Sequence, residues 1–317
     1  MGDRDFLMTT HFLIKKAFIF VISLTMVITL TFFLMHLIPG DPFMEEQMIS
    51  EEILKAMHHD YGLDKPLIMQ YFYYLKGLFH LDLGFSFKYQ GRPVAQIISE
   101  AFPISFALGI QALLIALGGG LIGGSIASLY HRKWQDQAIL AFLALCLSVP
   151  AFLSATLFQY LFAMQLDLFP VARWGSFSHT ILPSLALALF PFAYLARLAR
   201  TNIIEVLQQD YIVTARSKGL SQWEILYKHV LKNALLPVVA YLGPLIAAVF
   251  MGSFVIEKIF GIPGLGQWLV TSIGNRDYPL IMGLAIFYSF LLMGFNFLVD
   301  CVYYLLDPRI KKGESNG

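Results

Sequence analysis

The sequence predicts an all-α, polytopic membrane protein with six transmembrane helices. Three observations predict this fold class. The 317 residues are 57% hydrophobic with a mean hydropathy of +0.66, well above the about 45–50% apolar share of soluble domains. Six runs without Asp, Glu, Lys or Arg are each long enough to cross a hydrocarbon core, which takes about 20 helical residues. Lys and Arg are in excess on one side of these runs, as in cytoplasmic loops.

The first predicted span covers 17–35 and, with a short cytoplasmic tail, makes up residues 1–37. It is predicted to be retained, because its apolar run exceeds the 7–15 residues of a signal peptide and "HLIPGDP" follows it instead of a small-residue cleavage site. Residues 38–100 form a predicted extracytoplasmic segment. Its aromatic stretch "DYGLDKPLIMQYFYYLKGLFHLDLGFSF" predicts a folded cap of short helices instead of a disordered tail.

The other five spans lie in a predicted core, 101–307, and residues 308–317 form a second cytoplasmic tail. These spans cover 101–130, 137–166, 174–196, 233–256 and 278–299. The run "GGGLIGG" at 118–124 pairs Gly119 with Gly123 and Gly120 with Gly124 at a spacing that lets two helix backbones approach closely. Four prolines inside spans each remove a backbone donor and favour a bend. They are Pro150, Pro183, Pro191 and Pro244.

The distribution of cations predicts that both termini are cytoplasmic. With the N-terminus inside, the inner side holds 14 of the 22 Lys and Arg residues and the outer side holds 8. The formal net charge is only +1, which argues against a nucleic-acid partner because such a surface needs clustered cations. Cys146 and Cys301 lie in apolar runs and are interpreted as small hydrophobic residues.

A basic stretch between the fourth and fifth spans, 201–235, is predicted to be a helical hairpin on the inner side. Residues 202–218 can form one helix, which Gly219 ends in a left-handed cap. Ser221 and Glu224 form the S-x-x-E capping box of a second helix, 221–235. On this helix one face is predicted to carry Trp223, Leu226 and Val230.

Composition leaves two functions open for this hairpin. An amphipathic helix with Lys228 and Lys232 one turn apart can lie on anionic membrane lipid. The same pattern suits a docking element for a soluble partner protein.

Seven motifs, one in the basic stretch and six spread along the chain, resemble those of one known protein family. "DYIVTARSKGLS" at 210–221 is similar to the importer signature, with Thr214 and Ala215 in its alanine positions and Gly219 as its glycine. Val213 departs from this signature, which has glutamate there. The other motifs follow in chain order: "LIPGDP" (37–42), "YGLDKP" (61–66), "LDLGFSF" (81–87), "IFGIPGLG" (259–266), "NRDYPLIMG" (275–283) and "VDCVYYLLDPRI" (299–310). Together the seven motifs resemble the B-type permease subunits of the oligopeptide, dipeptide and nickel ABC importers.

The resemblance implies a type I ABC importer transmembrane fold and a peptide permease of the bacterial cytoplasmic membrane, with nickel import as the alternative. It implies a second, C-type permease subunit, two ABC ATPase subunits and an extracytoplasmic substrate-binding protein as partners. ATP and Mg²⁺ would bind the ATPase subunits, with no cofactor on this chain. The hairpin would couple to the ATPase through Asp210, Tyr211, Thr214, Ala215, Arg216, Lys218, Gly219, Leu220, Ser221 and Trp223.

Other protein classes find less support in the residues. The chain has no G-x-x-x-x-G-K-[ST] loop for nucleotide phosphates, so we expect a transport subunit and no enzyme. An ion-coupled secondary transporter usually carries ionisable groups at mid-membrane depth, whereas these spans have few, and Asp300 is interpreted as a structural hydrogen-bonding residue. An intramembrane hydrolase using Ser125 would lack a nearby His and acid to activate the hydroxyl.

Overall fold

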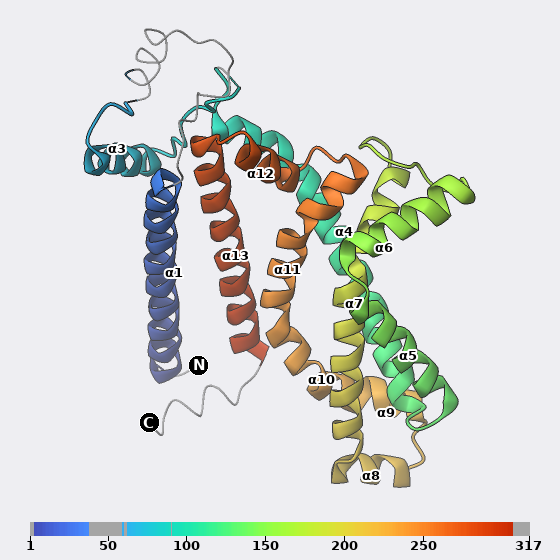
Figure 1. The fold of residues 1–317 in the computed structure, drawn as a ribbon. Helices are drawn as coiled ribbons and strands as arrows, with labels where there is room; N and C mark the ends of the chain where they lie inside the picture. Colours follow the sequence, from blue (N-terminus) through green and yellow to red (C-terminus); the bar gives the residue numbers. More distant parts are fainter. Residues whose placement is uncertain (1–2, 38–58, 60–61, 90, 307–317) are drawn as a thin grey trace.

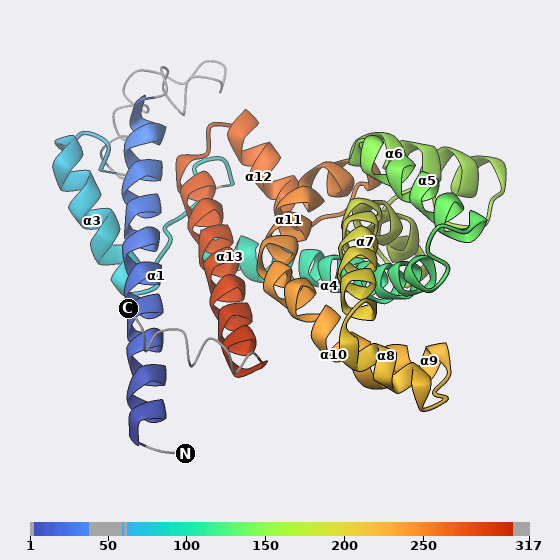
Figure 2. The ribbon, with the colours of Figure 1, turned by 90° about the horizontal axis from the view of Figure 1, so that it is seen from below.

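The long helices stand side by side, and short helices gather at their two ends (Figure 1 and Figure 2). The computed structural model describes residues 3–37, 59, 62–89 and 91–306. Within these residues the regular elements are helices, with one isolated bridge between Phe85 and Pro93. The predicted all-α class is therefore confirmed.

Five long helices form the bundle: α1 (Asp3–Leu37), α4 (Val94–Leu129), α7 (Ser178–Leu207), α11 (Leu236–Phe260) and α13 (Tyr278–Leu306). Between α4 and α7 lie α5 (Trp134–Ser148), α6 (Ala151–Phe158) and a π-helix (Gln159–Gln165). The short helices are α3 (Leu67–Phe79), α8 (Asp210–Ser217), α9 (Gln222–Ile225), a π-helix (Leu226–Val230), α10 (Leu231–Ala234) and α12 (Leu265–Gly274). In the described residues, four single helices suit a membrane span, and two bent pairs raise this number to six.

The third predicted span is not one straight helix, because α5 and α6 meet at a bend of 104°. Pro150 lies in the break and disfavours helical geometry at Val149, which is extended with φ −86° and ψ 120°. A second bend of 56° separates 222–234 from the start of α11. Pro183, Pro191 and Pro244, in contrast, lie inside unbroken helices. Only one of the four predicted prolines therefore lies at a break.

Two glycines of α4 pack closely against α7. A Cβ atom added at Gly124 would lie 2.5 Å from the carbonyl oxygen of Ala196, and one added at Gly120 would lie 2.9 Å from the Cβ atom of Leu195. Both distances are too short for a larger residue, so the predicted close approach of two backbones at Gly120 and Gly124 is confirmed. The apolar core around this contact also includes Ile212 and Ile225 of the basic stretch.

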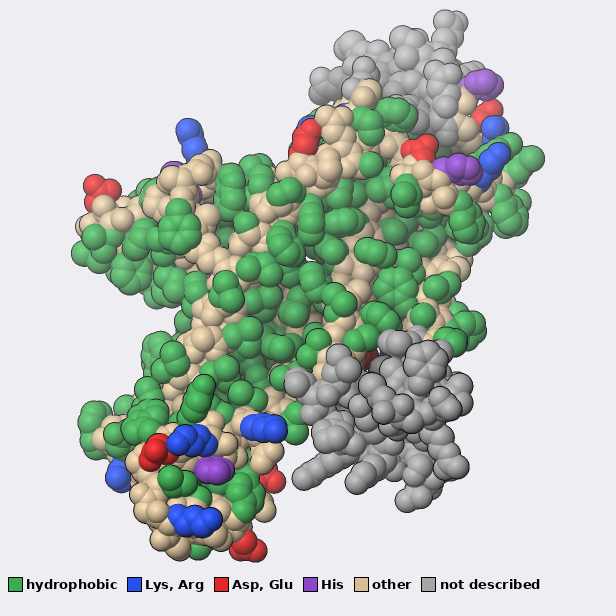
Figure 3. All heavy atoms as spheres, turned by 180° about the vertical axis from the view of Figure 1, so that it is seen from behind, with side chains coloured by type: hydrophobic (Ala, Val, Ile, Leu, Met, Phe, Trp, Pro, Cys, Tyr) green, Lys and Arg blue, Asp and Glu red, His purple; other side chains and the backbone are tan. Residues whose placement is uncertain are grey.

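The two ends of the bundle differ in what they carry. At the cap end lie α3, α12 and the start of α13 (Figure 1). At the hairpin end lie α8, α9, the beginning of α1 and the end of α13. Figure 3 shows hydrophobic side chains across the middle of the molecule and charged side chains toward the ends, which is the distribution that a bilayer-embedded protein requires.

Two buried carboxylates organise the cap end. Asp277 precedes α13 and accepts hydrogen bonds from the Ser86 hydroxyl and, at 3.1 Å, from the backbone N–H of Phe87. It therefore joins the "LDLGFSF" and "NRDYPLIMG" motifs. Near the end of α11, Glu257 accepts a hydrogen bond of 2.7 Å from the Ser105 hydroxyl of α4 and one of 3.1 Å from the backbone N–H of Gln267 in α12.

The first helix is attached at the side of the bundle, next to α13 (Figure 2). Only 6% of its most apolar window is buried within this chain. An ion pair joins the Nζ of Lys16 to Oδ2 of Asp300 at 2.6 Å. Asp300 therefore forms a hydrogen-bonded contact between α13 and α1. In the predicted extracytoplasmic segment 38–100, residues 38–58 lie outside the described residues. The helix of its described aromatic stretch is α3 (Leu67–Phe79). Helix α4 begins at Val94, before the predicted start of its span.

Candidate coupling site

The hairpin begins with a short helix that is separate from the preceding span. Sequence analysis predicts one helix over 202–218, and this is wrong, because α7 ends at Leu207 and α8 starts at Asp210. Gln209 between them is extended, with φ −75° and ψ 147°. The carboxylate of Asp210 lies in the first turn of α8, where a negative charge is favourable to the helix dipole. The hairpin can therefore take its own direction relative to α7.

Gly219 ends α8 in the left-handed conformation, as predicted, with φ +82°. Its N–H donates to the carbonyl of Arg216 at 2.9 Å, and the N–H of Lys218 donates to that of Thr214 at 3.2 Å. A Cβ atom at Gly219 would meet nothing within 4 Å. The requirement for glycine is thus one of backbone conformation and not of space.

The predicted capping box of the second helix is also confirmed. The Ser221 hydroxyl accepts a hydrogen bond of 3.3 Å from the N–H of Glu224, whose carboxylate accepts one of 3.1 Å from the N–H of Ser221. Glu224 also pairs with Lys228 at 3.6 Å, one turn later. Local interactions therefore define both sides of the turn at Gly219.

One side of the hairpin is packed into the bundle and the other is exposed. Leu226 and Val230 are buried, with exposed fractions of 3% and 0%. Trp223 does not share their surroundings, contrary to prediction, because 58% of it is exposed. It lies one helical turn from Tyr227, which is 78% exposed. The π-helix at 226–230 changes the periodicity between these residues.

Most predicted coupling residues lie on the exposed side. Ala215 is buried and Leu220 is half-buried. The others are exposed: Asp210, Tyr211, Thr214, Arg216, Lys218, Gly219, Ser221 and Trp223. We call the exposed aromatic residues Tyr211, Trp223 and Tyr227, with the cations Lys218 and Lys228, the exposed surface of the hairpin.

Sequence reasoning missed a hydrogen bond that joins the two arms of the hairpin. The Asn233 side-chain amide donates to the hydroxyl of Tyr211 at 2.9 Å, which links α10 to α8. No local pattern indicates a pair that is 22 residues apart. Tyr227 was also missed, although its i+4 spacing from Trp223 is a signal that could have indicated it.

Behind the hairpin lies a pocket of about 240 Å³ between the ends of α4 and α7 and the two short helices. Its lining includes Ser128, His131, Leu207, Arg216, Gln222 and Ile225. The apolar side chains of the hairpin therefore pack on the bundle, and the pocket lies next to this contact. In the described residues, no group of three or more His, Cys, Asp and Glu side chains could hold a metal ion.

The long apolar helices of this bundle define a polytopic membrane protein. The family model described as "Binding-protein-dependent transport system inner membrane component" matches residues 119–312, and its N-terminal companion matches 8–109. The chain belongs to this family.

Curated relatives are similar over almost the whole chain. The dipeptide transport system permease protein DppB of Bacillus subtilis is 48% identical over 301 residues, which cover 95% of this chain and 98% of the relative. The oligopeptide transport system permease protein OppB of Salmonella typhimurium is 39% identical over 302 residues, with coverages of 95% and 99%. The chain is therefore a B-type permease subunit of an ABC importer, and ATP hydrolysis belongs to separate subunits.

Solved structures support the fold. An amino acid ABC transporter crystallised with histidines has a TM-score of 0.53 at 17% identity, covering 66% of this chain and 94% of the solved one. The MetNI methionine ABC transporter in an inward-facing conformation has a TM-score of 0.52 at 15% identity, with coverages of 68% and 96%. These similarities confirm the type I importer fold that the resemblance implies.

Proposed function

We propose that this chain forms half of the translocation path of a peptide importer in the bacterial cytoplasmic membrane. The relatives named above are permeases for dipeptides and oligopeptides, which supports peptides over nickel as the substrate. The proposed complex contains a second, C-type permease, two ATPase subunits that hold ATP and Mg²⁺, and an extracytoplasmic binding protein. The hairpin end faces the cytoplasm in this arrangement, and so do both termini.

Within this complex, the hairpin is the docking element for one ATPase subunit. The observation that carries this proposal is the division of its side chains: Leu226 and Val230 are buried in the bundle, while Trp223 and Tyr227 are exposed. In Figure 1, α8 also lies farther along the bundle than the ends of α1 and α13. Large exposed aromatic residues next to cations are typical anchors of protein interfaces.

In the rival interpretation the hairpin lies on membrane lipid. Cross-linking distinguishes lipid binding from docking on the ATPase. A photoreactive residue in place of Trp223 should form an adduct with the ATPase subunit in membranes that contain the whole complex. Adducts with phospholipid alone would refute docking.

Side-chain truncation gives a second test. Trp223→Ala and Tyr227→Ala should each lower the amount of ATPase that co-purifies with the permease and should lower peptide uptake. Tyr73→Ala is the matched control, because Tyr73 is an aromatic residue that is 54% exposed and lies in α3 at the opposite end. Equal effects of all three substitutions would contradict the proposal.

A further inference from the structure

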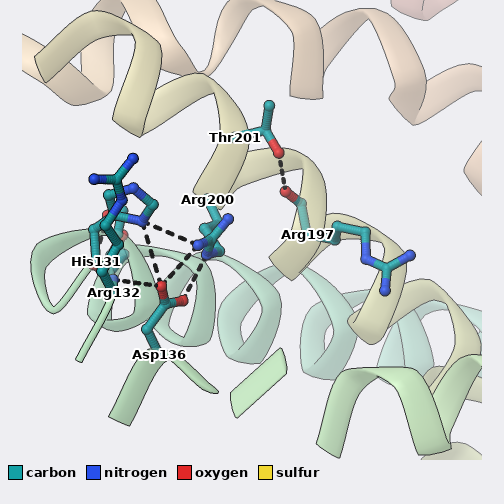
Figure 4. A network of polar contacts seen from close by, with 8 residues as sticks. His131, Arg132, Asp136, Arg197, Arg200 and Thr201 are labelled. Carbon is teal, nitrogen blue, oxygen red and sulfur yellow. Dashed lines mark hydrogen bonds and ion pairs between the residues drawn. The ribbon is translucent and has the colours of Figure 1, made fainter. Parts of the chain in front are cut away.

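A buried carboxylate joins the loop between α4 and α5, the start of α5 and the hairpin-end portion of α7 (Figure 4). Oδ1 of Asp136 accepts a hydrogen bond of 2.7 Å from Nε of Arg200, and Oδ2 accepts one of 2.7 Å from Nη2. Oδ2 also accepts the backbone N–H of Arg132 at 2.9 Å and lies 3.3 Å from Nδ1 of His131. The same nitrogen of His131 lies 3.1 Å from Nη2 of Arg200.

The geometry of this pair is bidentate, which fixes direction as well as distance. Two parallel N–H···O bonds hold the guanidinium and the carboxylate in one plane. The side chain of Asp136 is only 3% exposed and that of Arg200 is 16% exposed. Because Asp136 is buried, moving Arg200 away would leave its carboxylate without its main charged partner, which is unfavourable.

The pair joins α5 to α7, and the packing of α5 on α7 differs from the packing of α4 on α7. Gly120 and Gly124 hold α4 tightly against α7, so these two helices form one rigid unit. Helix α5 meets α7 through small and apolar residues, Leu143 and Cys146 against Ala193 and Ala196. Apolar contacts of this kind are non-directional, so they permit sliding and rotation. Asp136 and Arg200 add a directional contact to this apolar interface between α5 and α7.

The two helices that the pair joins lead to the hairpin at one end and to the bend between α5 and α6 at the other. Arg200 lies on α7 just before the helix passes into α8 of the hairpin, and Asp136 lies in the first turn of α5. At its other end α5 meets α6 at the 104° bend. A displacement of the hairpin can thus reach α5 through α7, and the bend at Val149 and Pro150 can absorb the change in angle.

We propose that Asp136 and Arg200 are positioning residues that make α5 move with α7 when the ATPase displaces the hairpin. This inference rests on the proposed function of the hairpin. Neither residue contacts substrate or nucleotide in this role. Their loss leaves ATP hydrolysis running while less peptide is moved for each ATP consumed.

The test uses the complete complex in proteoliposomes with its binding protein. Arg200→Lys keeps the positive charge beside Asp136 but removes the planar two-donor geometry. We expect normal assembly and a rise of about fivefold or more in ATP hydrolysed per peptide imported, the lower end of typical coupling energies. Arg197→Lys is the matched control, since Arg197 lies on the same helix with its guanidinium turned away from Asp136 (Figure 4). It should keep the wild-type ratio.

A spectroscopic measurement separates transmission from stability. Spin labels at positions 137 on α5 and 205 on α7, in a background without Cys146 and Cys301, report the distance between the two helices. In the wild type this distance should stay the same when ATP binds, because the helices move together. In Arg200→Lys it should change on ATP binding.

The outcomes distinguish the two proposals. A wild-type ATP-to-peptide ratio in Arg200→Lys, or a loss of uptake that only follows a loss of assembly, would overturn the role of the pair. The hairpin proposal would survive that result if Trp223→Ala still reduced ATPase binding. If Trp223→Ala had no effect while Arg200→Lys uncoupled transport, the docking proposal would fail and the pair would transmit movement from another contact.

Discussion

Replacement of Gly219 tests whether the shape of the hairpin turn matters for coupling. Gly219 has φ +82° and open space around it, so a Cβ atom there meets no neighbour within 4 Å. The whole effect of Gly219→Ala therefore comes from the left-handed backbone, which disfavours most residues by about 1–2 kcal/mol. If this strain is relieved when the turn opens, the docking-competent hairpin becomes about fivefold to thirtyfold less populated relative to the open one.

Gly219→Asn provides the control for this prediction, because asparagine visits the left-handed region more readily than alanine does. Binding of purified ATPase subunits to the reconstituted permease pair should weaken in the order wild type, Asn, Ala, and peptide uptake should follow the same order. Equal binding by the Ala and Asn variants would show that backbone conformation at residue 219 is not what the docking requires.

Three further predictions concern packing and caps. Ser221→Ala removes the capping hydroxyl, which is worth about 0.5–2 kcal/mol, so amide hydrogen exchange over 222–226 should accelerate while exchange in α7 stays unchanged. Gly124→Val should prevent stable assembly, because its Cβ atom would lie 2.5 Å from the Ala196 carbonyl oxygen, whereas Gly118→Ala, with nothing within 4 Å of its added Cβ atom, should purify like the wild type. Asp277→Ala leaves the Ser86 hydroxyl without its carboxylate acceptor and should lower stability by about 1–3 kcal/mol, measured as a lower melting temperature in detergent; a Tm equal to that of the wild type would contradict it.

The features that sequence predicts well are those in which neighbours along the chain interact. The cap at Gly219 and the box formed by Ser221 and Glu224 depend on residues within one turn of each other, so their spacing is visible in the sequence. The glycine pair in "GGGLIGG" is visible for the same reason, although nothing in the sequence indicates that α7 is the helix it packs against.

The features that sequence misses depend on tertiary contacts. Asp136 and Arg200 are separated by 64 positions, and only the packing of α5 on α7 brings them together. The exposure of Trp223 could not be read from apolar periodicity, because a π-helix interrupts the regular helix at Leu226. Hydropathy detects the third apolar run but not its sharp bend. A proline alone does not reveal the bend, because the helix breaks at Pro150 but continues through Pro183, Pro191 and Pro244.

The contacts of Glu257 constrain how the helices at the cap end of the bundle can move relative to one another. One carboxylate holds Ser105 of α4 and the amide of Gln267 in α12, while the Ser105 hydroxyl accepts the amide of Leu265 at 2.8 Å. Three elements thus share a single anchoring point at the cap end. Movement of α12 alone would cost the hydrogen bonds that the backbone N–H groups of Leu265 and Gln267 donate to Ser105 and Glu257, so displacement of the three elements together is favoured.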